Sequence, residues 1–230
     1  IDHLPVHHTN EIAQSEGASG KPFAHYWMHT NHILVENEKI AKSLGNGITL
    51  EDIKKRGFSF EALRLLVLES HYRSQSKFSW DNLEAAENRL RDLQAAADLR
   101  HQPTTESMSE ELDLFFKKTK EEIKDAMTDD LNTPRALAAL STFVDHIFSI
   151  PIPATDGKYS DGTLGFFDDI FGLKLSNRPD ITDEQKSIIR EREKVRHDKN
   201  WKKSDELRDE LKQQGLGLRD TMFGPQWYRI

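Results

Sequence analysis

The chain has 230 residues, of which 36% are hydrophobic and 31% are charged, and its formal net charge is −7. This length fits one large domain or several small ones, and the high charged fraction favours small helical units with much surface. A negative net charge does not predict that the chain as a whole binds nucleic acid. The absence of cysteine excludes disulfides and thiolate metal ligands within the chain and is typical of a reducing compartment. No apolar run approaches the roughly 20 residues that cross a bilayer, so no membrane partner is expected.

The first motif is HHTNE, residues 7–11, at the start of a short helix predicted to end near residues 15–17. In a helix His7 and Glu11 stand four positions apart and project from one face. An imidazole and a carboxylate at that spacing suit Zn²⁺, and His8 with Glu11 is the alternative pair. Two ligands are only half of a tetrahedral site, and the same stretch is also an ordinary polar start of a helix.

The second motif is EKIAKSLGNG, residues 38–47, which overlaps a strand-like segment with a turn expected at residues 36–38. It places Lys39, Lys42 and Ser43 beside glycines. A lysine is a compact charge that binds phosphate, and glycine lets a phosphate approach the backbone closely. The stretch is therefore either a phosphate-holding arm or a solvated loop. Thr49 is predicted to cap the helix that follows it.

The middle of the chain is predicted to be a helical bundle, because its apolar residues recur at steps of three and four. Helices are expected over 59–70, capped by Ser59, over 81–100, and over 110–127, capped by Ser109. A further helix is expected with Thr133 as its cap and Pro134 at its first position. The motif DDLNTP, residues 129–134, is interpreted as a turn and a cap without chemistry of its own.

The C-terminal segment is predicted to form a helix from about residue 183 to 197, a second helix over 201–213 and a hairpin. Residues 184–204 carry eight basic and four acidic side chains, so this region is locally positive. An exposed basic patch beside Trp201, Trp227 and Tyr228 would attract a nucleic-acid backbone and stack unpaired bases. A solvated helix face explains the same pattern equally well.

Taken in order, these motifs resemble the C-terminal half of a cysteinyl-tRNA synthetase, a class I aminoacyl-tRNA synthetase, over nearly the whole chain. HHTNEIAQS is similar to the family's HHENEIAQS, and KIAKSLGN is similar to the class I signature KMSKSLGN. The other segments that carry the resemblance are YWMH, LRLLVLESHYRSQSKFSWDNLEAAENRL, DDLNTPRALAAL, KNWKKSDELRDEL, LGLRDT and QW.

The resemblance implies a mainly α fold. A helical bundle would be flanked by a remnant of a class I, Rossmann-like catalytic domain and by a small α+β anticodon-binding unit. The implied domains are a catalytic remnant with the KMSKS-like loop at 1–57, connecting helices at 58–104, the bundle at 105–177 and the anticodon-binding unit at 178–230.

The resemblance also implies roles for individual residues. The family activates cysteine with ATP and Mg²⁺ to form cysteinyl-adenylate, then transfers cysteine to tRNA(Cys). Its zinc ion is held by two upstream cysteines and by a His and a Glu, which correspond here to His7 and Glu11. Lys42 would contact the ATP phosphates, assisted by Lys39 and Ser43. The implied protein is a cytoplasmic monomer, and its anticodon contacts would be Arg196, Asp205, Asp220 and Trp227.

The sequence departs from the family pattern in two ways. Ile40 and Ala41 replace the Met and Ser of KMSKS, and Thr9 replaces a Glu of HHENE, while the lysines, the last Ser and the zinc-type His and Glu remain. The HIGH-type motif and both zinc cysteines are missing, and the chain starts without an initiator Met, so an inactive fragment of a longer protein is expected. The alternatives are a ligase that joins cysteine to a sugar amine in thiol biosynthesis, an isolated tRNA-binding module and an inert helical scaffold.

Overall fold

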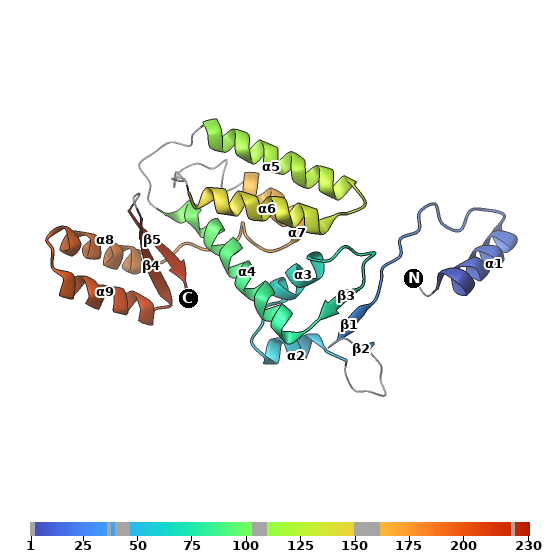
Figure 1. Ribbon diagram of the computed structural model, residues 1–230, viewed down its shortest axis with the longest axis horizontal. Coiled ribbons are helices and arrows are strands. Elements are labelled where there is room, and N and C mark those ends of the chain that lie inside the picture. The colour runs from blue at the N-terminus through green and yellow to red at the C-terminus, as the bar shows by residue number, and fades with distance from the viewer. Residues whose placement is uncertain (1–2, 36–37, 40–46, 103–109, 150–161, 222–223) are drawn as a thin grey trace.

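The computed structural model describes residues 3–35, 38–39, 47–102, 110–149, 162–221 and 224–230. The fold is mainly α, as expected. The long helix α4 (Trp80–Asp98) crosses the molecule from a small sheet near the N-terminal part to a small unit at the C-terminus (Figure 1). Within the described residues, no helix is both long and apolar enough to cross a membrane.

The N-terminal part consists of a π-helical turn, η1 (Leu4–His8), which continues directly into α1 (Thr9–Ser19). Gly20 ends α1 in the left-handed conformation, with φ of 63°. None of the residues in η1 and α1 is buried. In Figure 1 this helix stands apart from the rest of the molecule, to which an extended segment connects it.

A small sheet follows, with strand order β2-β1-β3. Strand β1 (Ile33–Val35) pairs antiparallel with β2 (Glu38–Lys39), in agreement with the strand expected there. Residues 36 and 37 of the expected turn lie outside the described residues. Strand β1 also pairs parallel with β3 (Ser76–Phe78), which the sequence did not predict. A parallel pair needs a crossover, and α2 (Leu50–Lys55) and α3 (Phe60–Leu68) supply it.

Side-chain caps begin the helices that lead into the bundle. The Thr49 side chain accepts a hydrogen bond from the amide of Asp52, and the Asp52 carboxylate accepts one from the Thr49 amide. Two amides at the start of the helix that have no carbonyl partner within it are thereby satisfied. Ser59 begins α3 and Ser79 begins α4 in the same way. The predicted caps at residues 49 and 59 are therefore confirmed.

The bundle consists of α3, α4, α5 (Glu110–Thr128), α6 (Thr133–Ile147) and α7 (Leu164–Phe171), which share one apolar core (Figure 1). Helices α3 and α6 pack on α4, and α5 packs on α6. The centre of the bundle is apolar and buried. Phe143 and Phe167 are each at most 2% exposed, and their rings meet edge to face with centroids 5.3 Å apart. The aliphatic core residues with at most 2% exposure include Leu65, Leu83, Leu90, Ile123, Leu137 and Leu140.

In the DDLNTP turn, the helix α6 is capped one residue earlier than predicted. The cap of α6 is Asn132, whose side chain accepts the amide of Arg135 at 3.2 Å, and Thr133 is already helical. Asp130 and Leu131 have φ of 55° and 53°, a conformation that residues other than glycine rarely adopt. The carboxylate of Asp130 accepts hydrogen bonds from Tyr72 at 2.6 Å and from Arg73, which fix this turn against the loop that follows α3.

The C-terminal unit is formed by α8 (Asp183–His197), α9 (Trp201–Gln213) and an antiparallel hairpin of β4 (Leu216–Thr221) and β5 (Gly224–Arg229). The two helices and the hairpin predicted for this segment are confirmed. The unit has its own apolar cluster, separate from that of the bundle, formed by Ile181, Ile189, Leu211, Leu216, Leu218 and Trp227.

Candidate functional sites

One carboxylate of the C-terminal unit lies among several guanidinium groups. Arg192 of α8 donates two hydrogen bonds to Asp220 of β4, at 2.8 and 3.0 Å, in the bidentate geometry that suits an arginine and a carboxylate. Arg196, one helical turn further on, lies 2.9 Å from the second oxygen of Asp220. Arg208 reaches the same strand from α9 and donates to the carbonyl of Leu218. The strand and both helices of the unit therefore meet at Asp220.

The burial of this cluster is uneven. Arg192 is only 1% exposed, and within the described part of the chain its Nε has no hydrogen-bond partner. Asp220 is 35% exposed and Arg196 is 37% exposed, so the outer side of the cluster faces solvent. The hydrogen bonds from Arg192, followed by the charges of Arg192, Arg196 and Arg208, lower the pKa of Asp220. The carboxylate is thus ionised at neutral pH and is surrounded by a surplus of positive charge.

An exposed aromatic ring adjoins the cluster. The guanidinium of Arg196 lies 5.7 Å from the ring centre of Trp201, within cation–π range, and Trp201 is 57% exposed. Asp205 stands one turn after Trp201 on α9, and it is also exposed. The family resemblance assigned Arg196, Asp205, Asp220 and Trp227 to one site. It did not assign Arg192 and Arg208 to that site, and the sequence named Trp201 only as a nearby aromatic.

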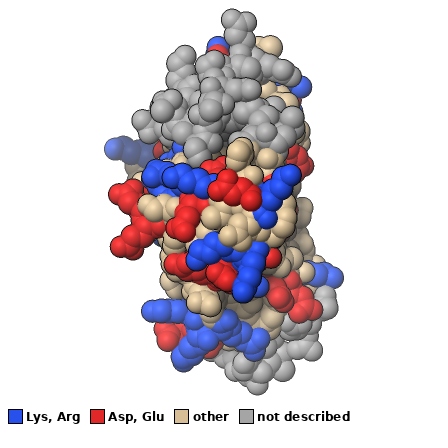
Figure 2. Space-filling model, turned by 90° about the vertical axis from the view of Figure 1, so that its left-hand side faces the viewer, with Lys and Arg blue, Asp and Glu red and all other residues tan. Residues whose placement is uncertain are grey.

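The surface around this cluster is of mixed sign. The face of the molecule seen from the left of Figure 1, where α8 and α9 lie, shows lysines and arginines interspersed with aspartates and glutamates (Figure 2). Alternating charges of this kind do not form a uniformly basic patch. Recognition of an anionic partner would therefore depend on particular side chains, such as the Arg196 and Trp201 pair, and less on the overall field.

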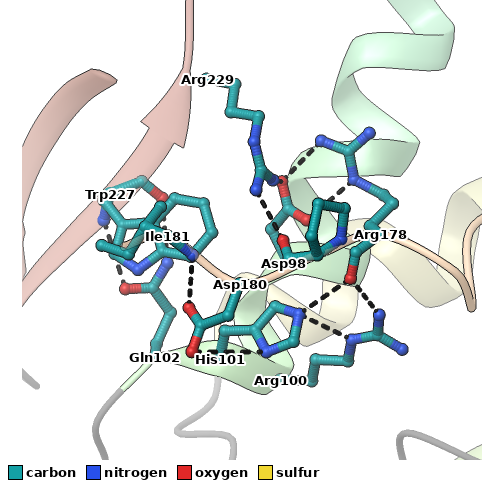
Figure 3. A network of polar contacts seen from close by, with 10 residues as sticks. Asp98, Arg100, His101, Gln102, Arg178, Asp180, Ile181, Trp227 and Arg229 are labelled. Carbon is teal, nitrogen blue, oxygen red and sulfur yellow. Dashed lines mark hydrogen bonds and ion pairs between the residues drawn. The ribbon is translucent and has the colours of Figure 1, made fainter. Parts of the chain in front are cut away.

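Trp227 lies in a different environment from the other predicted residues. It is 4% exposed and belongs to the apolar cluster of the C-terminal unit. Its backbone amide donates to Gln102, and its ring stacks on His101 with centroids 6.4 Å apart. Figure 3 shows Trp227 beside these two residues, where its ring cannot stack an unpaired base in this arrangement.

The Asp220 cluster gives the C-terminal unit a pH dependence of definite sign. The pKa of Asp220 is lower in the folded chain than its ordinary value of 3.8. The ionised pair is therefore fully stabilising above that value, and its contribution is lost as the pH falls through the lower folded value. We expect the free energy of unfolding of the wild type to decline more steeply below about pH 4 than that of an Asp220→Asn variant. Chemical denaturation at several pH values measures this, and parallel curves for the two proteins would contradict it.

His7 and Glu11, the predicted metal ligands, are both exposed and lie on the continuous η1–α1 helix. Other histidines lie close to those of this helix: the ring of His3 lies 4.9 Å from that of His7, and Nδ1 of His8 lies 3.0 Å from Nε2 of His29, in the extended segment after α1. Desolvation, followed by the charge of His29, lowers the pKa of His8. Among the described residues, no group of three or more His, Asp or Glu side chains is placed to hold a metal ion.

The predicted phosphate-binding residues are described only in part. The backbone of Lys39 belongs to β2 and pairs with Leu34 of β1. Lys42 and Ser43 lie outside the described residues. On the far side of this stretch, the chain enters α2 through the capping pair of Thr49 and Asp52, and the Thr49 hydroxyl and amide lower the pKa of Asp52. Both described flanks are thus fixed, by a strand pairing on one side and by a capped helix on the other.

Comparisons with known proteins identify two regions of the chain. Residues 1–88 match the family model described as the tRNA synthetases class I (C) catalytic domain. Residues 178–229, which include α8, α9 and the hairpin, match the model of the cysteinyl-tRNA ligase anticodon binding domain. Both matched regions are thus similar to domains of class I aminoacyl-tRNA synthetases.

Curated relatives narrow the class to one family. The chain is 37% identical over 233 residues to the cysteine–tRNA ligase of Chlamydia felis. That alignment covers 98% of the chain and 49% of the Chlamydia protein. It is 38% identical over 245 residues to the enzyme of that name from Lachnospira eligens, with 97% and 49% covered. For the one from Treponema denticola the identity is 37% over 258 residues, with 100% and 51% covered. The chain belongs to the cysteine–tRNA ligase family, as predicted, and spans about half the length of the curated relatives it matches.

Proposed function

We propose that this chain is part of an enzyme that activates cysteine with ATP, forms cysteinyl-adenylate and transfers cysteine to tRNA(Cys). The observation that carries the proposal is that a match to a class I synthetase catalytic domain and a match to an anticodon-binding domain occur in a single chain. A ligase that acts only on small molecules has no anticodon to read. The second match therefore favours tRNA over a sugar amine as the acceptor of cysteine.

In this proposal the C-terminal unit reads the anticodon. Trp201 presents an exposed ring on which an unpaired base can stack, and Arg196 beside it can contact a phosphate or a base edge. Asp205 and Asp220 offer carboxylate oxygens that accept hydrogen bonds from base amino groups. Arg192 holds Asp220 in position from the buried side. Trp227 is left out of this role because its ring is buried.

The N-terminal part would serve the chemistry at ATP. Lys42, with Lys39 and Ser43, would hold the phosphates of ATP, which enters as its Mg²⁺ complex. The lysine charge would stabilise the negative charge that develops as pyrophosphate leaves. The 230-residue chain alone is expected not to form the adenylate, because the family's HIGH-type motif is absent from its sequence. The activity would belong to the longer protein, which we expect to act as a monomer in the cytoplasm.

A zinc site would also need residues from outside this chain. His7 supplies an imidazole and Glu11 a carboxylate, and zinc accepts both kinds of donor. They are two of the four ligands that a tetrahedral site requires, and the sequence contains no thiolate to complete it. When bound, the zinc ion would supply an open position that favours the soft thiolate of cysteine over the hydroxyl of serine.

Aminoacylation by the full-length protein tests the proposal. We expect radiolabelled cysteine to be transferred to tRNA(Cys) in the presence of ATP, and serine not to be transferred. A parallel reaction with an amino sugar in place of tRNA tests the alternative activity, because a cysteine–sugar-amine ligase would join cysteine to the sugar without any tRNA. Transfer to the amino sugar without transfer to tRNA, or loading of serine while cysteine is ignored, would refute the proposal.

A further inference from the structure

Among the described residues, the C-terminal unit and the bundle do not share an apolar core. Most of the buried apolar residues fall into two separate clusters, one in the bundle and one in the C-terminal unit. A groove of about 500 Å³ lies between α4, α6 and β5, lined by Arg91, Asp145, Gln226 and Tyr228 among others. In the described part of the chain, apolar packing therefore does not fix the small unit against the bundle, and polar contacts do so.

A polar cluster at the end of α4 provides these contacts (Figure 3). Asp98, the last residue of α4, is 1% exposed. Its carboxylate accepts two hydrogen bonds from Arg178, at 2.8 and 2.7 Å, and a third from Arg229 at 2.6 Å. Arg178 is 15% exposed and Arg229 is 32% exposed, so the charges are largely removed from water. One buried carboxylate thus joins two arginines that are distant from it and from each other in the sequence.

A second contact reinforces the first one. The side-chain amide of Gln102, which is 4% exposed, donates to the carbonyl of Trp227 at 2.9 Å and accepts the amide of Trp227 at 3.2 Å. Gln102 therefore occupies the outer edge of β5 in the way that a neighbouring strand would. We call Asp98, Gln102, Arg178, Trp227 and Arg229 the clamp.

The clamp holds both ends of the C-terminal unit. Arg178 lies on the segment that enters the unit, five residues before α8 begins, and Arg229 is the last residue of β5. Arg229 also donates to the carbonyl of Pro179, so the two ends are tied to each other. In β4, Leu216 pairs with Arg229 and Leu218 pairs with Trp227, so anchoring β5 also sets the position of β4 and of Asp220.

The opposite end of α4 contacts the N-terminal part of the chain. Trp80, its first residue, meets Phe78 of β3 edge to face, and the guanidinium of Arg56 lies 3.8 Å from the centre of its ring. The 19 residues of α4 span about 28 Å at 1.5 Å per residue. A single helix thus sets the separation between the region that matches the catalytic domain and the region that matches the anticodon-binding domain.

From this geometry we propose that Asp98 is a positioning residue for tRNA. Through the clamp it fixes the anticodon-binding unit on the end of α4, so that a tRNA bound there presents its acceptor end to the catalytic domain. The inference rests on the proposed function. Asp98 touches neither tRNA nor ATP in this scheme, and its effect is confined to substrates that reach both ends of the enzyme.

The test compares Asp98→Asn with Glu84→Gln in the full-length protein. Both substitutions remove one negative charge from α4, but Glu84 is exposed and has no ion pair among the described residues. Three rates are measured: adenylate formation, charging of tRNA(Cys), and charging of an RNA hairpin that carries the acceptor stem alone. We expect Asp98→Asn to lower kcat/KM for tRNA about tenfold or more, mainly through KM. Adenylate formation and hairpin charging should stay within about twofold of the wild type, as all three rates should for Glu84→Gln.

Two outcomes would overturn the inference. If tRNA charging is unchanged, the clamp does not position the unit; if tRNA and hairpin charging fall equally, Asp98 only supports the fold. If Asp98→Asn fails to fold, Arg229→Gln replaces it in the test, because this variant keeps the Asp98–Arg178 pair. It should also lower charging of tRNA(Cys) and spare the other two rates, but by a smaller factor. Amide hydrogen exchange of β5 needs no RNA, and it should accelerate in Asp98→Asn but not in Glu84→Gln. A wild type that charges no tRNA would refute the proposed function, whereas unchanged exchange in β5 would refute the clamp.

Discussion

Replacing Asp220 by alanine is expected to lower the free energy of unfolding of the C-terminal unit by about 3 kcal/mol. The reason lies in Arg192, which is 1% exposed and donates two hydrogen bonds to Asp220. Without the carboxylate, a buried guanidinium keeps its charge and loses its counter-charge, and its Nε already lacks a partner among the described residues. Because Asp220 is itself 35% exposed, water can approach the vacated position, so we expect the lower end of the range for a broken buried pair.

The matched control for this substitution is Asp209→Ala. Asp209 belongs to the same unit, is exposed and has no ion pair among the described residues. Its replacement should change the free energy of unfolding by at most about 0.5 kcal/mol. Urea denaturation, followed by amide hydrogen exchange within α8 and β4, measures both variants. Equal stabilities would show that the Arg192–Asp220 pair contributes nothing to the fold of the unit.

A third variant separates the two roles of the cluster. Asp205 is exposed on the same helix as Trp201, and among the described residues no buried arginine pairs with it. If it contacts the anticodon as proposed, Asp205→Ala weakens tRNA binding while stability is unchanged. Asp220→Ala weakens both. The comparison therefore distinguishes a residue that binds RNA from one that also maintains the site.

The elements that the sequence predicted well are those decided by local chemistry. The caps at Thr49 and Ser59 follow from one hydroxyl three residues before an amide, and the apolar stripe of α4 follows from its own period of three and four. These rules involve residues within one or two turns of each other. They do not depend on how the rest of the chain is arranged.

The features that the sequence did not reveal depend on distant partners. Strand β3 has only three residues, and it forms because Phe78 and its neighbours lie beside β1, more than forty positions earlier. The cap of α6 moves to Asn132 because the two residues before it take left-handed conformations that Tyr72 and Arg73 hold in place.

The same reasoning applies to the candidate sites. Arg192 was counted in an exposed basic patch because charged side chains are rarely buried. Its burial depends on Asp220, 28 positions away. Trp227 was expected to stack a base because aromatic residues near basic ones do so in RNA-binding proteins, but strand pairing turns its ring into the small core. A motif thus identified the region of the site, whereas only the packing distinguishes the residues that face solvent from those that support them.

The largest kinetic effect is expected at Lys42. In the full-length protein, Lys42→Ala should slow the formation of cysteinyl-adenylate on the order of a hundredfold, if its charge acts mainly as pyrophosphate departs. Lys42 itself lies outside the described residues. The flanks of its segment are fixed by the pairing of Lys39 with Leu34 and by the capping pair of Thr49 and Asp52. The substitution should therefore leave the surrounding fold intact.

Cysteine-dependent exchange of pyrophosphate into ATP measures this step without tRNA. A loss in kcat, with a smaller change in KM for ATP, would indicate that Lys42 acts in the transition state more than in binding. Lys54→Ala is the matched control, because Lys54 is exposed on α2, twelve residues further on, and has no ion pair among the described residues. It should leave the exchange rate unchanged. If Lys42→Ala also leaves the rate unchanged, the segment is a solvated loop, and the assignment of phosphate contacts to it is wrong.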